Sequence, residues 1–188
     1  MKNLNRELDA FLQAIKHDFC WVLYSYEYVD TRIGSYHERT QRALFPFCCK
    51  LSAQLVSSFL YANYSNETEC IYATGRGIEH AWTVCENTII DYTDFQFESS
   101  FNEYRDRFKS YDISEEELRR IVSGYDIYYS RKEHSHDIFR GSDLFNIRAV
   151  EMLAVDKAKE YPFTKEGFLD FVNGVFTEVQ LQMNYYGE

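Results

Sequence analysis

The sequence has no apolar run that approaches the roughly 18 residues needed to cross a membrane. Its first residues also lack the apolar stretch of a secretory signal peptide. No block of five or more like charges occurs, so an acidic tail does not explain the formal net charge of −10. Because this negative average field repels a phosphate backbone, we expect no binding to nucleic acid. Because the sequence shows neither a membrane span nor a signal peptide, we expect a cytoplasmic protein that does not bind membranes.

The number and spacing of the cysteines indicate neither a disulfide framework nor a cysteine-based metal site. The five cysteines are an odd number, which suits a reducing compartment. No C-x-x-C spacing occurs to support the metal-like pair His134-Ser-His136, for which we predict a solvated loop. We expect no metal and no other cofactor, and we interpret Cys20, Cys70 and Cys85 as ordinary core or strand residues.

What is present indicates one globular domain spanning residues 1–188. The chain is 45% hydrophobic and 27% charged, with 16 Tyr and 15 Phe that suggest a core built from large rings. No internal repeat, low-complexity segment or linker interrupts it. The order of the expected helices and strands predicts a single α+β domain.

Periodicity gives the expected helices and strands. Apolar spacing at i, i+3 and i+4 predicts helices from about Asn3 to the high twenties and from Pro46 to about Ala62. A capping box begins at Ser114. The remaining expectations are three strands joined as an antiparallel meander and two C-terminal helices, placed at Glu69–Thr74, His80–Cys85, Thr88–Tyr92, Asn146–Glu160 and Thr164–Met183.

Three residue types in this order can build a thiol active site. A cysteine nucleophile needs a thiolate, which the positive end of a helix and a nearby histidine both favour. Cys48 and Cys49 lie in the first turn of the second expected helix, and His80 begins a strand. Asp91 lies on the next strand, where it can fix the tautomer of the imidazole. The sequence therefore predicts a Cys-His-Asp triad.

The same residues resemble a known superfamily. The segment His80–Phe97 reads H-A-W, a short hairpin and D-x-T-x-x-Q-F, and Phe45–Cys49 opens a helix with a cysteine pair. This text is similar to papain-like and transglutaminase-like cysteine enzymes, and most of all to a bacterial group of small transglutaminase-like proteins. The resemblance covers residues 45–97. It implies a nucleophile helix packed on a small antiparallel sheet, with further N- and C-terminal helices around this core.

The nucleophile is one of two neighbouring cysteines. On a helical wheel at about 100° per residue, Cys48 falls in the middle of the apolar arc with Leu51 and Leu55. Cys49 falls at the edge of that arc, and the small residue Ala53 follows it four positions later, as transglutaminase-like helices prefer. We favour Cys49. We keep Cys48 as the alternative, because the spacing from Cys48 to the following small residues resembles the papain helix.

Four further residues are candidates for support of the site or its cleft. We expect Trp82 to pack in the core rather than to contact substrate, although a Trp beside the histidine can also wall the cleft. Thr93 and Gln96 are expected to hold the Asp91 loop rather than to touch substrate. Gln41 lies upstream of the cysteines, where a papain-like resemblance makes it an oxyanion donor; the backbone N–H of Cys49 is the better candidate for that role.

The expected function is that of a cysteine-dependent amide hydrolase or acyltransferase, namely a peptidase (thiol protease), a deamidase or a transglutaminase acting on a protein or peptide. A thioester would form on the cysteine, and the sequence does not choose between water and an amine as acceptor. A catalytically inactive papain-like binding or regulatory module is the alternative, and a protein toxin or effector domain is a third interpretation. The sequence does not indicate an oligomeric state.

Overall fold

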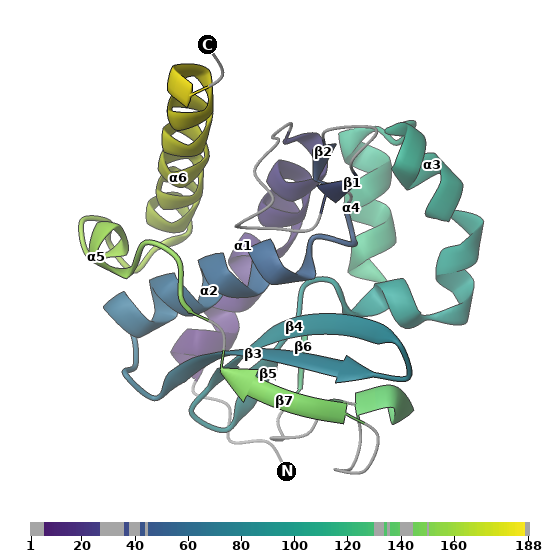
Figure 1. Ribbon diagram of the computed structural model, residues 1–188, viewed down its shortest axis with the longest axis horizontal. Helices are drawn as coiled ribbons and strands as arrows, with labels where there is room; N and C mark the ends of the chain where they lie inside the picture. The colour runs from purple at the N-terminus through teal and green to yellow at the C-terminus, as the bar shows by residue number, and fades with distance from the viewer. Residues whose placement is uncertain are drawn as a thin grey trace.

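The computed structural model describes residues 6–26, 36–37, 42–43, 45–129, 134, 136–139, 145–149 and 151–186. Within these ranges the chain has an α+β fold in which α2 lies across one face of a sheet (Figure 1). The described helices are α1 (Arg6–Ser25), α2 (Cys49–Asn63), α3 (Arg105–Ser110), α4 (Glu115–Ser123), α5 (Val155–Ala158) and α6 (Lys165–Tyr186). Three short 3₁₀ helices are η1 (Asp94–Phe97), η2 (Ser99–Glu103) and η3 (Asp137–Phe139).

The main sheet has five antiparallel strands in the order β6-β5-β4-β3-β7. A separate two-stranded ladder pairs β1 with β2. The strands are β1 (Tyr36–His37), β2 (Arg42–Ala43), β3 (Thr68–Gly75), β4 (Ile78–Cys85), β5 (Thr88–Ile90), β6 (Tyr128–Tyr129) and β7 (Phe145–Ala149).

The predicted meander is confirmed, with one correction that concerns the site. Strands β3, β4 and β5 are neighbours in the sheet, and the two-residue turn after Cys85 brings Thr88 opposite it. We predicted a third strand that includes Asp91, but β5 ends at Ile90. The backbone N–H of Asp91 leaves the ladder and donates to the carbonyl of Ile127 at 2.5 Å. Asp91 therefore begins a turn, which frees its side chain to face β4.

One helix prediction in the C-terminal third was wrong. We expected a helix over Asn146–Glu160, whereas residues 145–149 form β7 and only Val155–Ala158 is helical. Strand β7 pairs with β3 along its whole length, with Ile147 opposite Ala73. Pairing with the open edge of β3 satisfies the backbone of β7, and such tertiary context outweighs a local helical pattern. The last expected helix is confirmed as α6.

The core joins α1, α2 and α6 through stacked aromatic rings. Phe59 of α2 has its ring centroid 5.7 Å from that of Phe11 on α1 and 5.2 Å from that of Phe168 on α6. All three side chains are buried. Aromatic pairs at such distances add to the free energy gained by burial, so α2 is held on both sides. The expectation that the many rings fill the core is confirmed.

A hydrogen bond between α2 and β4 positions the residues of the predicted triad. The hydroxyl of Thr83, which is fully buried on β4, donates to the carbonyl of Ala53 on α2 at 3.0 Å. Ala53 lies one helical turn after Cys49, and Thr83 lies three residues after His80. This bond fixes the first turn of α2 against the strand that carries the histidine.

The predicted helix cap is confirmed at Ser114, with a different partner for its glutamate. The Ser114 hydroxyl accepts from the backbone N–H of Glu117 at 3.3 Å, as in a capping box. The Glu117 carboxylate, however, accepts two hydrogen bonds from the Arg107 guanidinium, at 2.6 and 2.7 Å. A bidentate guanidinium is a stronger partner than one backbone N–H, so Glu117 links α4 to α3.

The surface offers one further observation about membranes. None of the helices in the described ranges is both long and apolar enough to cross a bilayer.

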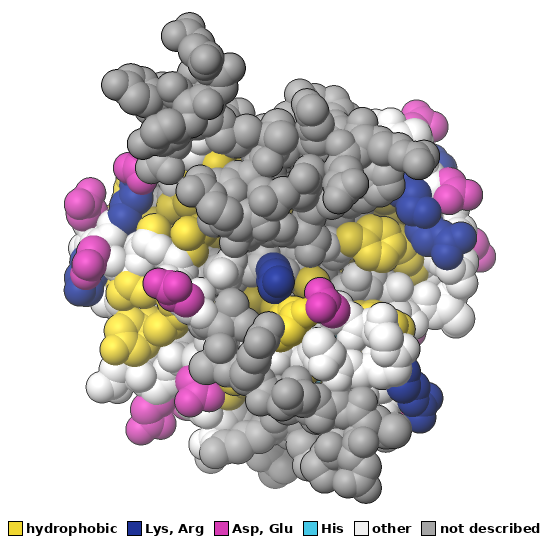
Figure 2. Space-filling model, viewed as in Figure 1, with side chains coloured by type: hydrophobic (Ala, Val, Ile, Leu, Met, Phe, Trp, Pro, Cys, Tyr) yellow, Lys and Arg dark blue, Asp and Glu magenta, His cyan; other side chains and the backbone are white. Residues whose placement is uncertain are grey.

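On the face shown in Figure 2, basic side chains (dark blue) lie beside acidic ones (magenta) at both sides of the view.

Candidate active site

Cys49 is the first residue of α2, and its thiol meets the histidine of the neighbouring strand. The Cys49 thiol lies near the imidazole of His80 and helps to raise the pKa of that ring. Cys49 is 7% exposed, whereas Cys48, its neighbour at the helix cap, is fully buried. The partial positive charge at the start of a helix stabilises a thiolate at this position. The helix-wheel prediction that Cys48 is a buried core residue is confirmed, and Cys49 is the cysteine that influences the pKa of His80.

The other thiols lie in surroundings that favour the neutral form. Burial, together with the neighbouring thiols of Cys49 and Cys20, raises the pKa of Cys48 well above its usual range. Burial likewise raises the pKa of Cys20 to about 12, and those of Cys70 and Cys85 to about 11. All five cysteines are free of disulfide bonds, and the core or strand positions predicted for these last three are confirmed.

His80 and Asp91 form a direct buried pair. The Nε2 atom of His80 donates to Oδ2 of Asp91 at 2.5 Å, and neither side chain is more than 1% exposed. The two residues come from β4 and from the turn that follows β5, which the hairpin places side by side. Since Nε2 donates to Asp91, Nδ1 is the ring nitrogen that can exchange a proton with another group.

The Asp91 carboxylate is held at both of its oxygens. Oδ1 accepts from the backbone N–H of Thr93 at 2.9 Å and from the Thr93 hydroxyl at 3.0 Å. These contacts confirm that Thr93 holds the Asp91 turn. Gln96 has a different place from the one expected, because its side-chain amide lies 3.2 Å from Nδ1 of His80. It therefore contacts the imidazole itself on the side that faces away from Asp91.

Opposing effects set the charge of the His80–Asp91 pair. Burial alone lowers the pKa of His80, but the negative charge of Asp91, the hydrogen bond to it and the hydrogen bond to Cys49 raise that pKa to about 10. Burial alone raises the pKa of Asp91, and the facing charge of His80 and hydrogen bonds from two histidines bring it well below its usual range. The pair is therefore an imidazolium held by a carboxylate.

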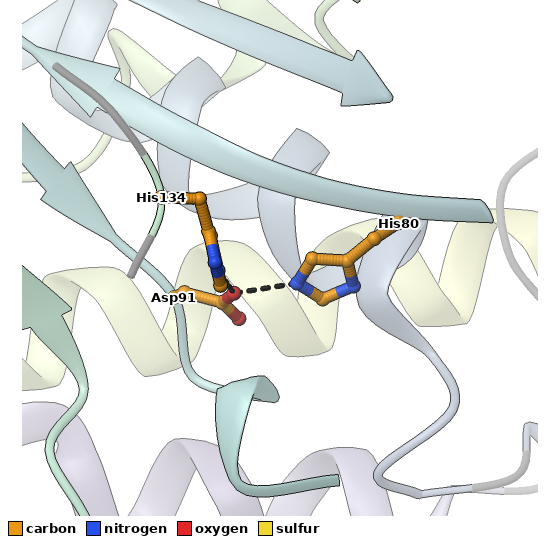
Figure 3. Close-up of side chains that lie close together, drawn as sticks. All are labelled: His80, Asp91 and His134. Atoms are coloured by element: carbon orange, nitrogen blue, oxygen red, sulfur yellow. Dashed lines mark hydrogen bonds and ion pairs between the residues drawn. The ribbon is translucent and has the colours of Figure 1, made fainter. Parts of the chain in front are cut away.

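One further residue of the site was missed by the sequence analysis. His134, for which we predicted a solvated loop, is fully buried, and that prediction is wrong. Its Nε2 atom donates to Oδ2 of Asp91 at 2.8 Å, so the carboxylate lies between two imidazole rings (Figure 3). Hydrogen bonding to a buried carboxylate offsets the cost of removing a histidine from water. The H-x-H pattern signalled this segment, but nothing local to it identifies Asp91 as its partner.

Asp94 and His136 extend the polar cluster toward the surface. Oδ1 of Asp94 lies 3.1 Å from Nε2 of His134 and 2.9 Å from Nε2 of His136, whose side chain is 18% exposed. The backbone N–H of His136 donates to Nδ1 of His134 at 3.3 Å. Burial lowers the pKa of His134 and its hydrogen bonds to Asp91 and Asp94 raise it overall, while the N–H of His136 opposes a second proton on the ring.

Two groups in the described part of the chain have the residue types of a metal site. His80, Asp91 and His134 form one, and Asp94, His134 and His136 form the other, each with its ligand atoms within 4.8 Å of one another. A histidine that binds a metal through Nε2 carries its proton on Nδ1. His134 has the opposite arrangement, because Nε2 donates to Asp91 and Nδ1 accepts from the backbone. Hydrogen bonding therefore accounts for this cluster better than ligation does.

The remaining predicted support residues have different outcomes. Trp82 is 2% exposed and its ring centroid lies 5.8 Å from that of His80, so it packs against the imidazole. It also lines a surface hollow of about 520 Å³ together with Ile71 and Glu69. Gln41 lies outside the described residues. Trp82 therefore lies between the surface hollow and the imidazole of His80. The expected oxyanion role of Gln41 stays a prediction.

Comparison with known proteins gives no assignment for this arrangement: no family model, no curated protein and no solved structure matches the chain.

Proposed function

We propose that the chain is a cysteine-dependent amide hydrolase or acyltransferase with a papain-like or transglutaminase-like core, in which Cys49 is the nucleophile. The observation that carries this proposal is the buried hydrogen bond between His80 and Asp91, with the Cys49 thiol at the start of α2 near the same imidazole. Nucleophile, base and orienting carboxylate in this order are the parts of a thiol active site. The nucleophile helix packed on an antiparallel sheet supports the same assignment.

In the proposed chemistry the thiol proton already lies on His80, so the resting site is an imidazolium beside the Cys49 thiolate. The Cys49 sulfur then attacks the carbonyl carbon of an amide, and the N–H groups of the first turn of α2, which lack intrahelical acceptors, stabilise the oxyanion. His80 returns the proton to the amine nitrogen as the C–N bond breaks, which leaves a thioester on Cys49. Asp91 keeps the imidazole in one orientation and stabilises its positive form throughout.

The second half-reaction regenerates the thiol and decides the outcome. His80 takes a proton from water or from an amine, which attacks the thioester carbonyl as the C–S bond breaks. Water gives a free acid, the result of proteolysis or deamidation, whereas an amine gives a new amide, the result of transglutamination. A protein or peptide is the proposed acyl donor, because its amides are the groups that this chemistry acts on.

One observation favours the alternative of a binding or regulatory module. His80 is fully buried and Cys49 is only 7% exposed, so the triad in this structure is nearly closed to a substrate. An inactive relative could keep the three residues for stability alone, since buried polar groups in such a network satisfy one another. The two functions differ in the reactivity of the thiol.

Alkylation of the folded chain with iodoacetamide near pH 6 separates these functions. We expect Cys49 to react at least about tenfold faster than each of the other four cysteines, because a thiol without a partner is well under 1% thiolate at this pH. Peptide mapping by mass spectrometry identifies the modified residue. Cys48→Ser is the matched control and should leave the labelling of Cys49 unchanged. Equal reaction of all five thiols, or reaction only after unfolding, would contradict the proposed enzyme.

A further inference from the structure

We infer that His134 is a positioning residue of the active site, acting on His80 through the shared carboxylate of Asp91. This inference rests on the proposed function of the Cys49 site. The Nε2 atoms of His80 and His134 both donate to Oδ2 of Asp91, at 2.5 and 2.8 Å, from two different directions (Figure 3). Asp91 is thus the centre of a His–Asp–His arrangement.

The tautomer of His134 makes it a donor rather than a base. Its Nδ1 accepts the backbone N–H of His136 at 3.3 Å, which places the ring proton on Nε2. An N–H donor at this position stabilises the ionised form of the buried carboxylate. The backbone of His136 therefore orients His134, and His134 in turn orients Asp91.

The surroundings of His134 hold the ring in this orientation. The charged and titratable groups that face it from the described elements are Asp91 after β5, Asp94 of η1, His80 of β4 and His136. Apolar rings cover its remaining sides: the Trp82 and Phe139 ring centroids lie 4.9 and 5.3 Å away. A ring packed in this way has one available orientation, so its hydrogen bond restricts Asp91 to one rotamer.

Four hydrogen bonds converge on the Asp91 carboxylate, and each has a separate consequence. The two from Thr93 come from the residue two positions later and keep the turn closed. Through the bond from His80, the carboxylate orients the imidazole beside the thiol and stabilises its positive form. The bond from His134 is the one that connects the carboxylate to a segment 43 residues away in the chain. Removing it leaves Oδ2 bonded to His80 alone, so that only the Thr93 bonds to Oδ1 and the His80 bond hold the carboxylate.

Removing the His134 donor should slow the alkylation of Cys49 only at a pH where the thiolate depends on the His80 imidazolium. In His134→Leu, alkylation of Cys49 near pH 6 should slow about tenfold, the scale of one hydrogen bond to a charged group. Well above the ordinary thiol pKa, where ionisation of the thiol no longer needs the imidazolium, the rate should match that of the wild-type chain. A purely structural role would not produce this dependence on pH.

His134→Gln is the conservative variant, since its side-chain amide supplies an N–H donor. The alkylation rate near pH 6 should recover in His134→Gln, and added imidazole should partly restore it in His134→Ala. Leu, Gln and Ala variants are compared by circular dichroism, and the imidazole rescue is a second readout if His134→Leu does not fold. Slow labelling of Cys49 in the wild-type chain would contradict the proposed function. Fast labelling in both the wild-type chain and folded His134→Leu would contradict the role of His134 alone.

Discussion

Replacing His80 with alanine is expected to slow alkylation of Cys49 near pH 6 by about 100-fold. Without the imidazole the thiol has no base within reach, and an unassisted thiol is only about 0.3% thiolate at this pH. The Asp91 carboxylate keeps its hydrogen bonds from His134 and Thr93 but no longer acts on the thiol through an imidazole. Second-order rate constants for iodoacetamide, measured from intact masses, give the size of the effect.

His17→Ala is the matched control for this variant. His17 is a half-buried histidine on α1 whose Nε2 lies 3.4 Å from the Ser123 hydroxyl, and it has no part in the site. Its replacement should leave the alkylation rate of Cys49 unchanged. A His80→Ala chain that is folded and still reacts as fast as the wild-type chain would show that the imidazole does not activate the thiol.

Replacing Asp91 with alanine is expected to lower the free energy of unfolding by about 3–5 kcal/mol, the usual cost of removing one partner from a buried ion pair. The variant leaves His80 and His134 in a fully buried site without the carboxylate that accepts from both rings. It also removes the acceptor for the backbone N–H and the hydroxyl of Thr93. Denaturation in urea, followed by circular dichroism, measures the change.

Asp106→Ala provides the matched control on an exposed carboxylate. The Asp106 side chain is 88% exposed, and its contacts with Arg105 and Lys109 are surface ion pairs of 4.0 and 3.9 Å. Its replacement should change the free energy of unfolding by about 0.5 kcal/mol or less. An equal, small effect for Asp91→Ala would mean that the buried His–Asp–His arrangement contributes nothing to stability.

The sequence was sufficient for the part of the site that local structure determines. His80 and Asp91 are 11 residues apart across a two-residue hairpin, so alternation and turn chemistry place them side by side. Helix periodicity likewise distinguished the buried Cys48 from Cys49, because it places Cys48 in the middle of the apolar arc of one helix and Cys49 at the edge of that arc. In each of these cases the physical constraint acts within one segment of the chain.

The parts that could not be predicted depend on contacts between distant segments. His134 is 43 residues from Asp91, and its burial follows from a carboxylate that its own segment does not reveal. Strand β7 is set by the open edge of β3, which local periodicity cannot report. Even Gln96, correctly placed near the site, contacts the His80 ring instead of the Asp91 turn, because η1 begins at Asp94 and redirects it.

Acylation by 4-nitrophenyl acetate tests the central claim most directly, since it asks whether Cys49 forms a thioester. The Cys49–His80–Asp91 site predicts a burst of nitrophenolate in the first turnover, with the acetyl group mapped to Cys49 by mass spectrometry. The burst should be absent in Cys49→Ser and should persist in Cys48→Ser. A wild-type chain with no burst beyond that of Cys49→Ser, or with the acetyl group on another residue, would contradict the account.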